Sequence, residues 1–260
     1  MKRLIAVMSC HRKSAWANAQ RQTWVKDVVE RGYADVVFFL GRGDAALRYV
    51  SYPKRDEVWL DVPDDYRGIP LKVQAIMRWA AERCYDITAK CDDDVYVVPD
   101  RVPYLPIDAH YVGRFRAPHG SVYPVHFASG FFYWLDNQSM KIVADTPWNG
   151  DWMDERFVAT ALARRGIIGN HDPVNYLVTG PHHAAPALLS NDAFRKGTVF
   201  CEYGPNAIHA HHLAMRRLSP VRTHPGLVLQ PQATVTDAIL TSAPNDDIPP
   251  HKLDRSYFVN

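Results

Sequence analysis

The apolar residues of this chain come in short runs that alternate with longer amphipathic segments. Leu4–Met8 and Val36–Leu40 are β-rich and almost continuously apolar, which is typical of strands covered on both faces of a parallel sheet. Ser14–Arg31 lies between them with apolar residues at roughly helical spacing, and Gly32 follows as a natural helix stop. This strand–helix–strand order predicts a βαβ unit and an α/β fold.

The same alternation continues to about residue 218. We expect further strands at Glu57–Val62, Ile87–Lys90, Val95–Val98, Tyr111–Arg116 and Ser129–Leu135, and helices at Leu71–Cys84 and Trp152–Arg165. From Pro220 onward the composition shifts to Pro, Thr, Asp and Asn. The sequence therefore predicts one domain over residues 1–219, with a mixed, mainly parallel central sheet. Residues 220–260 are expected to form a Pro-rich, partly ordered extension.

The overall composition excludes several classes of protein. A chain of 260 residues with 47% hydrophobic and 22% charged residues is not intrinsically disordered over most of its length. A net charge of +2 provides no basic arm for nucleic acid. The apolar runs are far shorter than the roughly 20 residues of a membrane helix, and the first one is too short for a signal peptide. Four cysteines without CxxC spacing, Cys10, Cys84, Cys91 and Cys201, are expected to be core thiols.

Three adjacent aspartates, Asp92, Asp93 and Asp94, follow the predicted strand Ile87–Lys90. Adjacent carboxylates repel one another unless they face water or a cation lies between them. In an extended chain Asp92 and Asp94 point to the same side, where both can meet one Mn²⁺ or Mg²⁺ ion. Such an ion stabilises the charge of a diphosphate leaving group. The pattern indicates a nucleotide-sugar enzyme, and a solvated acidic turn is the alternative interpretation.

Five sequence elements occur in order between about residues 4 and 217. They are Arg21-Gln22-Thr23-Trp24; Phe38-Phe39-Leu40-Gly41; the segment Tyr66…Leu71-Lys72…Trp79…Cys84…Lys90-Cys91-Asp92-Asp93-Asp94-Val95-Tyr96-Val97; Tyr123-Pro124 with Ala128-Ser129-Gly130-Phe131-Phe132-Tyr133; and Met153-Asp154-Glu155-Arg156-Phe157-Val158-Ala159. Together they resemble the β-1,3-galactosyltransferase-like family, which includes galactosyl-, N-acetylglucosaminyl- and Fringe-type transferases. The resemblance implies a GT-A-type, Rossmann-like domain. It also implies inverting, divalent-metal-dependent transfer of a hexose or N-acetylhexosamine from a UDP-sugar to an acceptor hydroxyl.

The resemblance also assigns roles at the aspartate triplet. Asp94 corresponds to the direct metal ligand, Asp92 to a position near the ribose or the metal's water shell, and Asp93 to one facing the sugar. Arg21 and Lys90 join these residues as expected donor-binding groups. For Arg21 the sequence leaves two interpretations open, a contact to a phosphate or a structural salt bridge.

A histidine-rich segment, Ile208–Met215, resembles the family's late histidine, which reaches back to the metal. The candidates are His209, then His211, then His212. The imidazoles of His209 and His211 would share a face if the segment were extended. A zinc site made from the three histidines alone has no fourth ligand at a recognisable spacing.

An inverting transfer needs a base for the acceptor hydroxyl. The family's Glu-Asp pair is inverted here to Asp154-Glu155. Glu155 aligns with the family's base, and Asp154 is the alternative base. In the other interpretation, both are ordinary carboxylates of a first helical turn that complement the helix dipole. Nearby, Trp148 and Trp152 have two interpretations, a sugar-stacking platform or a buried core.

Two other functions stay open. One is a catalytically inactive nucleotide-sugar- or carbohydrate-binding module, suggested by the inverted pair, and the other is a metal-dependent phosphoryl-transfer enzyme. The expected acceptor is a glycan, a glycoconjugate or another hydroxyl-bearing molecule, which includes a modified nucleic-acid base. The Arg-rich segment Met215–Arg222 is compatible with this last acceptor. Eukaryotic family members carry a Golgi anchor that this sequence lacks, so we expect a soluble, cytoplasmic protein of bacterial or viral origin.

Overall fold

The structure is a computed structural model that describes residues 1–43, 53–105, 109–116, 125–178, 198–201 and 204–218. The chain divides into two units, residues 1–220 and residues 221–260. The second unit lies outside the described residues, and so does the Pro-rich extension expected from residue 220. The motif residues Tyr123-Pro124 are also outside them.

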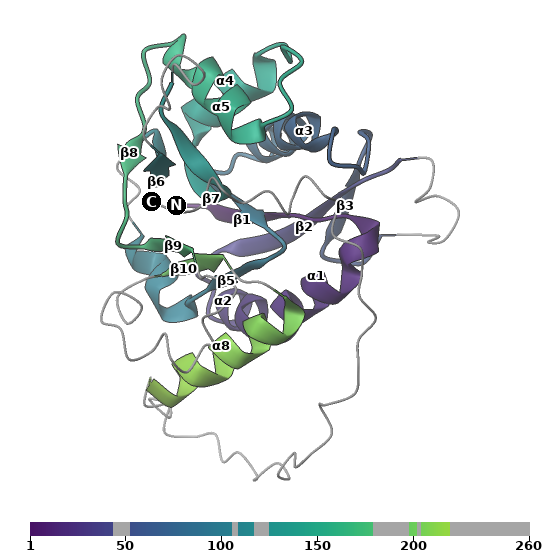
Figure 1. Ribbon diagram of the computed structural model, residues 1–260, viewed down its shortest axis with the longest axis vertical. Coiled ribbons are helices and arrows are strands. Elements are labelled where there is room, and N and C mark those ends of the chain that lie inside the picture. The colour runs from purple at the N-terminus through teal and green to yellow at the C-terminus, as the bar shows by residue number, and fades with distance from the viewer. Residues whose placement is uncertain (44–52, 106–108, 117–124, 179–197, 202–203, 219–260) are drawn as a thin grey trace. The chain divides into compact units, whose positions relative to one another are not determined.

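A seven-stranded sheet forms the centre of the first unit, in the order β3-β2-β1-β4-β7-β6-β8 (Figure 1). Its strands are β1 (Arg3–Met8), β2 (Asp35–Gly41), β3 (Glu57–Leu60), β4 (Ile87–Asp92), β6 (Tyr111–Arg116), β7 (Phe127–Asp136) and β8 (Asn170–His171). β1 runs parallel to β2 and β4, and β2 parallel to β3, whereas β7 is antiparallel to both β4 and β6. The predicted α/β class with a mixed, mainly parallel sheet is confirmed.

A second, three-stranded sheet has the order β5-β10-β9. It consists of β5 (Val95–Val97), β9 (Tyr176–Val178) and β10 (Val199–Cys201), with β5 antiparallel to β10. The chain passes from the large sheet to the small one through a turn at Asp93-Asp94. The two sheets therefore meet at the aspartate triplet. The sequence predicted the strand at Val95 but not its partners.

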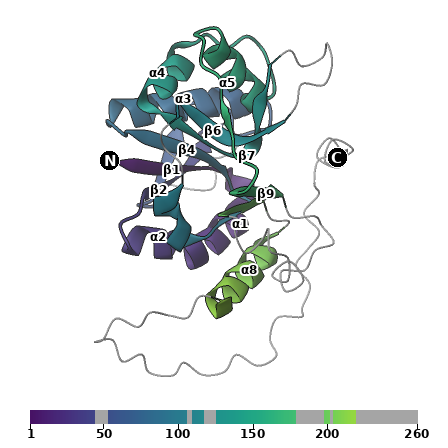
Figure 2. The same ribbon diagram turned by 90° about the vertical axis from the view of Figure 1, so that its left-hand side faces the viewer.

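Helices cover both faces of the large sheet (Figures 1 and 2). α3 (Ile69–Glu82), α4 (Asn137–Asp145) and α5 (Asp154–Ala163) lie on one face, and α1 (Ser14–Gln20) and α2 (Lys26–Glu30) on the other. Short helical turns η1 (His11–Lys13), η2 (Arg21–Val25) and η4 (Pro99–Tyr104) and the helix α8 (Pro205–Leu218) complete the described elements.

The strand β1 shows how the two faces acquire separate cores. Successive side chains of a strand point to opposite faces. Leu4 and Ala6 accordingly pack with residues of α3, α4 and α5, whereas Ile5 and Val7 pack with residues of α1, η2 and α2. This double coverage explains why the strand is apolar throughout, as predicted for a central parallel strand.

The single helix predicted for Ser14–Arg31 is interrupted, so this prediction was wrong. η2 is a π-helical turn in which Thr23 has non-helical dihedrals (φ −118°, ψ −112°), and its hydroxyl donates to the Ala19 carbonyl at 2.7 Å. The interruption accompanies a tertiary contact. The Trp24 indole N–H donates to the Val95 carbonyl at 3.0 Å and ties η2 to β5.

The cysteine prediction is confirmed in part. Cys10, Cys84 and Cys91 are free thiols. Cys91 is buried in β4 as expected, whereas Cys10 is half-buried. Cys84 is exposed after the end of α3, and its own backbone has a left-handed conformation (φ 54°). A core role for Cys84 was therefore wrong. The side chain of Cys201 lies outside the described residues.

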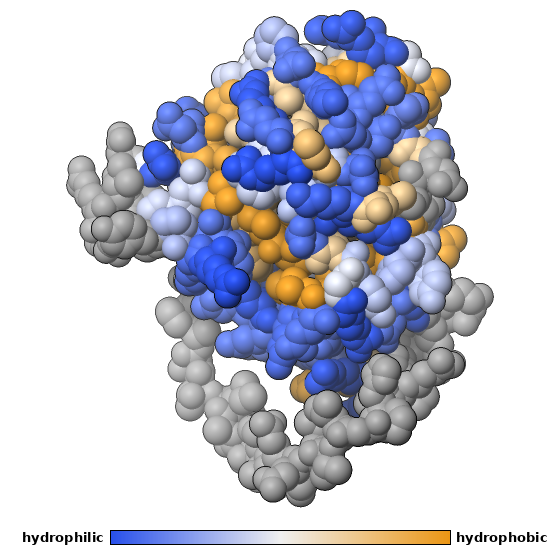
Figure 3. All heavy atoms as spheres, turned by 180° about the vertical axis from the view of Figure 1, so that it is seen from behind, coloured by the Kyte–Doolittle hydropathy of each residue, from blue (hydrophilic) through white to orange (hydrophobic). Residues whose placement is uncertain are grey.

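The surface seen from behind is mostly hydrophilic, with smaller apolar areas between the polar residues (Figure 3). Exposed apolar atoms are ordinary for a folded domain. Of the helices described, none combines the length and the apolar character that crossing a membrane requires.

Candidate active site

Lys90 occupies the centre of a polar cluster at the carboxyl end of β4. Its side chain is only 1% exposed, and its ammonium group lies 2.7 Å from Asp92 Oδ1 and 3.4 Å from Asp154 Oδ2. It also donates to the Gly130 carbonyl of β7. Burial lowers the pKa of Lys90, but the charges of Asp154 and Asp92 outweigh burial and raise it above its usual range. Lys90 is therefore a buried cation that holds two carboxylates together, which differs from the expected donor-binding role.

Asp93 points to a different set of partners from Asp92. Its carboxylate accepts from the Ser9 hydroxyl at 3.0 Å and from the Lys13 ammonium at 3.2 Å. Burial lowers the pKa of Lys13, but the charges of Asp93 and Asp94 raise it well above its usual range. The sequence interpretation missed Ser9 and Lys13. Their position directly after β1 was a usable signal, because the carboxyl ends of neighbouring parallel strands meet at one edge.

Asp154 and Glu155 begin α5 and bring a second pair of carboxylates to the cluster. Asp154 is buried, accepts from the Tyr133 hydroxyl at 3.4 Å and pairs with Lys90. Burial, the charge of Asp154 and a hydrogen bond to Asp154 raise the pKa of the half-buried Glu155 to about 8. A raised pKa is the usual result when a carboxyl group lies close to a second one in a buried place, because two such charges repel each other.

Gly130 makes room for this pair. A Cβ atom at Gly130 would lie 3.1 Å from Glu155 Oε2, closer than most Cβ contacts. The glycine thus allows the Glu155 carboxyl group to lie against β7, while the Gly130 carbonyl accepts a hydrogen bond from the Lys90 ammonium. The predicted residues Asp92, Lys90, Asp154 and Glu155 are therefore brought together.

A cavity of about 190 Å³ opens on the Asp93 side of the triplet. Its lining includes Ser9, His11 and Arg21. The Arg21 guanidinium forms ion pairs with Asp56 at 2.7 Å and Glu57 at 2.8 Å. Arg21 thus forms the structural salt bridge that the sequence left open, and its contact to a phosphate stays a prediction.

The expected metal ligands are not all brought together. Among the described residues, Lys13 pairs with Asp93, and Lys90 pairs with Asp92 and Asp154. Carboxylate oxygens are ligands that Mn²⁺ and Mg²⁺ accept. However, among the residues described, no three His, Cys, Asp or Glu side chains are grouped to hold a metal ion. The carboxylates therefore fit such an ion by charge and donor type, and the histidines do not join them.

The reason lies in the conformation of the histidine-rich segment. It forms the helix α8, so His209 and His211 do not share the face that an extended chain would give them. His211 is buried and stacks on Tyr96 with ring centroids 4.4 Å apart. His212 Nδ1 lies 3.2 Å from the Tyr96 hydroxyl. These contacts pack α8 against β5. The condition for a shared face, an extended segment, is therefore not met, and a metal contact by His209 or His211 stays a prediction.

The strand alternation assumed for Asp92 and Asp94 also fails. β4 ends at Asp92, and Asp93-Asp94 form a turn, so the two-residue repeat of a strand does not extend to Asp94. Trp148 and Trp152 are both exposed, which excludes the buried-core interpretation for them. Their role toward a sugar is not decided by exposure alone.

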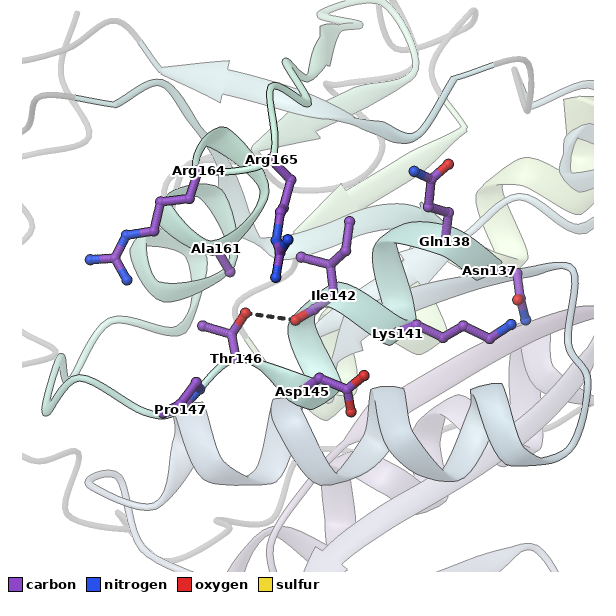
Figure 4. A pocket seen from close by; sticks show the side chains of 10 residues that line it. All are labelled: Asn137, Gln138, Lys141, Ile142, Asp145, Thr146, Pro147, Ala161, Arg164 and Arg165. Atoms are coloured by element: carbon purple, nitrogen blue, oxygen red, sulfur yellow. Dashed lines mark hydrogen bonds between the residues drawn. The ribbon is translucent and has the colours of Figure 1, made fainter.

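A larger cavity of about 690 Å³ lies between α4 and the carboxyl-terminal end of α5 (Figure 4). The Arg165 side chain points into it, and the Thr146 hydroxyl donates to the Ile142 carbonyl at its floor. None of the clustered carboxylates lines it, because Asp154 and Glu155 stand at the opposite end of α5. The cavity is separate from the candidate active site.

Comparison with known proteins identifies the segment that carries the triplet. Residues 16–113 match the galactosyltransferase family model. This galactosyltransferase segment runs from α1 to β6 and includes Lys90 and all three aspartates. The predicted family resemblance is confirmed over it, and the match supports the prediction of a glycosyltransferase. Asp154, Glu155 and α8 lie beyond the segment, so their roles depend on the geometry described above.

Individual relatives match more weakly. The mouse protein UDP-GalNAc:beta-1,3-N-acetylgalactosaminyltransferase 2 is 38% identical over 65 residues, which cover 25% of this chain and 13% of the mouse protein. A glycosyltransferase involved in glycosylation of the major capsid of PBCV-1 has a TM-score of 0.49 at 15% identity, covering 82% of this chain and 98% of its own. The galactosyltransferase LgtC, solved with donor and acceptor sugar analogs, has a TM-score of 0.46 at 12% identity, covering 82% and 95%.

Proposed function

We propose that the chain is an inverting glycosyltransferase that moves a hexose or N-acetylhexosamine from a UDP-sugar to an acceptor hydroxyl. The observation that carries this proposal is the meeting of Asp92 and the Asp154–Glu155 pair on Lys90, next to the end of β4 in the galactosyltransferase segment. Open α/β sheets bind their ligands at the carboxyl ends of the strands. A carboxylate pair at that edge has the chemistry for a proton transfer coupled to displacement at a sugar carbon.

The donor nucleotide belongs on the Asp93 side of the triplet in this proposal. The 190 Å³ cavity there is lined by polar groups from the ends of β1 and β3 and from α1. The cavity residue Ser9 and Lys13 both donate to Asp93, so the Lys13 ammonium lies near this cavity. This ammonium group is available to oppose the charge of a diphosphate as well as that of Asp93.

The proton transfer belongs to Asp154 and Glu155. As the acceptor oxygen attacks the anomeric carbon, its proton passes to the carboxylate pair, and the bond from that carbon to the UDP oxygen breaks. Lys90 pairs with Asp154 at 3.4 Å and fixes its position. Glu155 is our first candidate for the base and Asp154 the second, because Asp154 is already engaged by Lys90 and Tyr133.

Asp92 and Asp94 are the residues that would hold a divalent cation. When bound, Mn²⁺ or Mg²⁺ stabilises the negative charge that develops on the departing diphosphate. The support for this part of the proposal is that three adjacent carboxylates, which Mn²⁺ and Mg²⁺ accept as ligands, follow one another at the end of β4.

The substitution Asp94→Ala tests the metal part of the proposal. We expect the wild-type melting temperature to rise with UDP and Mn²⁺ together, because a ligand that binds only the native state stabilises it by mass action. In Asp94→Ala this Mn²⁺-dependent rise should disappear. Asp100→Ala, an exposed aspartate that pairs with Arg31, is the control and should keep it. An unchanged Mn²⁺-dependent rise in Asp94→Ala would contradict the assignment.

The pH dependence of turnover tests the base. Glu155 accepts a proton only when ionised, and its pKa is raised to about 8 by burial and by Asp154. If Glu155 is the base, UDP release from a UDP-sugar should rise nearly tenfold per pH unit below about 8 and level off above it. A rate that is flat between pH 6 and 8, or that falls above 8, would instead assign the base to Asp154. Donor binding without turnover up to pH 9 would favour an inactive binding module.

A further inference from the structure

The loop before α5 exposes two tryptophans on a fixed backbone. Trp148 is 41% and Trp152 54% exposed, although tryptophan is usually well buried. The loop is held internally. The Trp148 indole donates to the Asp151 carbonyl at 2.7 Å, the Asp151 carboxylate accepts from the Met153 amide at 3.1 Å, and Arg156 pairs with that carboxylate. Trp152 is thus presented to solvent by an ordered segment.

Tyr66 faces this tryptophan from a second ordered segment. The two rings lie 6.3 Å apart, tilted by 37°. The turn that carries Tyr66 is anchored by Asp64, whose carboxylate accepts from the Gly41 amide at 2.7 Å and from the Lys72 ammonium at 2.8 Å. The two rings therefore form a pre-arranged aromatic pair, which we call the Tyr66–Trp152 platform.

The platform borders the carboxylate pair. Burial raises the pKa of Tyr66, and the charges of Glu155 and Asp154 raise it further, so the phenol is near enough for both charges to act on it. Trp152 precedes Asp154 by two residues. A molecule resting on the platform would therefore lie beside the groups that accept the proton.

The platform and the donor cavity lie on different sides of the triplet. Asp93 faces Ser9, which lines the donor cavity. Asp92 faces Lys90 and, through it, Asp154. If the donor nucleotide binds on the Asp93 side, the platform is left for the acceptor.

We propose that the Tyr66–Trp152 platform is the acceptor subsite and that it binds the apolar face of a pyranose ring, so that the acceptor is a carbohydrate. This inference rests on the proposed function. Aromatic faces suit the C–H face of a sugar, and sugar hydroxyls donate to nearby carboxylates. A nucleic-acid base also stacks on aromatic rings, but its phosphates require cations. Three carboxylates, those of Glu155, Asp154 and Asp92, act on Tyr66 against one cation, Lys90, and this balance disfavours a phosphate backbone.

The test measures binding of defined sugars to the full chain without a donor. The probes are methyl β-D-galactopyranoside, methyl β-D-glucopyranoside and methyl N-acetyl-β-D-glucosaminide, followed by tryptophan fluorescence and by saturation transfer to the sugar protons. We expect at least one probe to bind the wild type. Trp152→Ala should weaken that binding about tenfold, the size of one aromatic contact, and Trp152→Phe should restore part of it. Tyr104→Ala, which removes an 83% exposed aromatic ring on η4, should leave it unchanged.

Two outcomes would overturn the inference: equal binding by Trp152→Ala and wild type, or binding of a short oligonucleotide but of no probe sugar. UDP release from UDP-galactose, UDP-N-acetylglucosamine or UDP-N-acetylgalactosamine with water as acceptor separates this result from the proposed function. If the wild type releases UDP and Trp152→Ala binds sugars normally, only the acceptor subsite fails. If no donor is turned over, the proposed glycosyl transfer fails, whatever the sugars do.

Discussion

Replacing Glu155 by Gln is expected to lower turnover by about 100- to 10,000-fold, the usual contribution of a positioned general base. The amide keeps the shape of the carboxyl group and its capacity to bond Asp154, but it cannot take a proton from the acceptor. UDP-sugar binding should be retained, because the donor cavity is lined by the residues that follow β1 and by residues of α1, β2 and β3, and none of α5. The loss should therefore appear in kcat, with little change in the donor KM.

Glu82→Gln provides a matched control for this substitution. Glu82 is exposed at the end of α3, away from the clustered carboxylates, and its substitution should leave kcat and donor binding unchanged. If Glu155→Gln stays active while Asp154→Asn is inactive, the base is Asp154. Activity in both variants would contradict a base in α5. The melting temperature of each variant must be recorded, because Asp154→Asn also removes a partner of Lys90.

The sequence predicted the fold well where the pattern depends on local burial. The apolar run Leu4–Met8 and the amphipathic segment Leu71–Cys84 correspond closely to β1 and α3. The interruption at Thr23 was not predictable in this way, since Trp24 takes its partner from β5, which lies 71 residues further along the chain. Tertiary contacts of this kind override local helical propensity.

The candidate site was predicted in its residue types more than in its connections. Asp92, Asp154 and Glu155 were identified from motifs, but the cation that joins the two segments was taken for a ligand-binding group. Lys90 is the fourth residue of the buried strand β4, and a lysine is expected in such a place only when its charged partners are known. His209 and His211 failed as a pair for a different reason. Helical and extended conformations orient alternate residues differently, and the sequence did not decide between them.

Replacing Lys90 by Met is expected to destabilise the fold strongly. Methionine is one atom shorter than lysine but similar in volume and unbranched, and it leaves Asp92 and Asp154 without their shared cation. Removing one partner of a buried ion pair usually costs about 3–5 kcal/mol, because the remaining charge stays buried and uncompensated. For a domain of this size that corresponds to a fall in melting temperature of roughly 6 to 20 °C. Thermal unfolding of the two proteins at pH 7 measures it.

Lys26→Met distinguishes this effect from a general loss of positive charge. Lys26 is an exposed lysine of α2 that lies 3.9 Å from Glu30, and exposed pairs contribute about 0–1 kcal/mol. Its substitution should barely change the melting temperature. A second readout separates positioning of the carboxylates from mere packing. Burial and Asp154 raise the pKa of Glu155, whereas the Lys90 charge lowers it. In folded Lys90→Met the pH at half-maximal turnover should therefore move above 8. Wild-type stability together with an unchanged pH profile would show that Lys90 does not organise the site, since a buried cation between two carboxylates cannot be removed without affecting both.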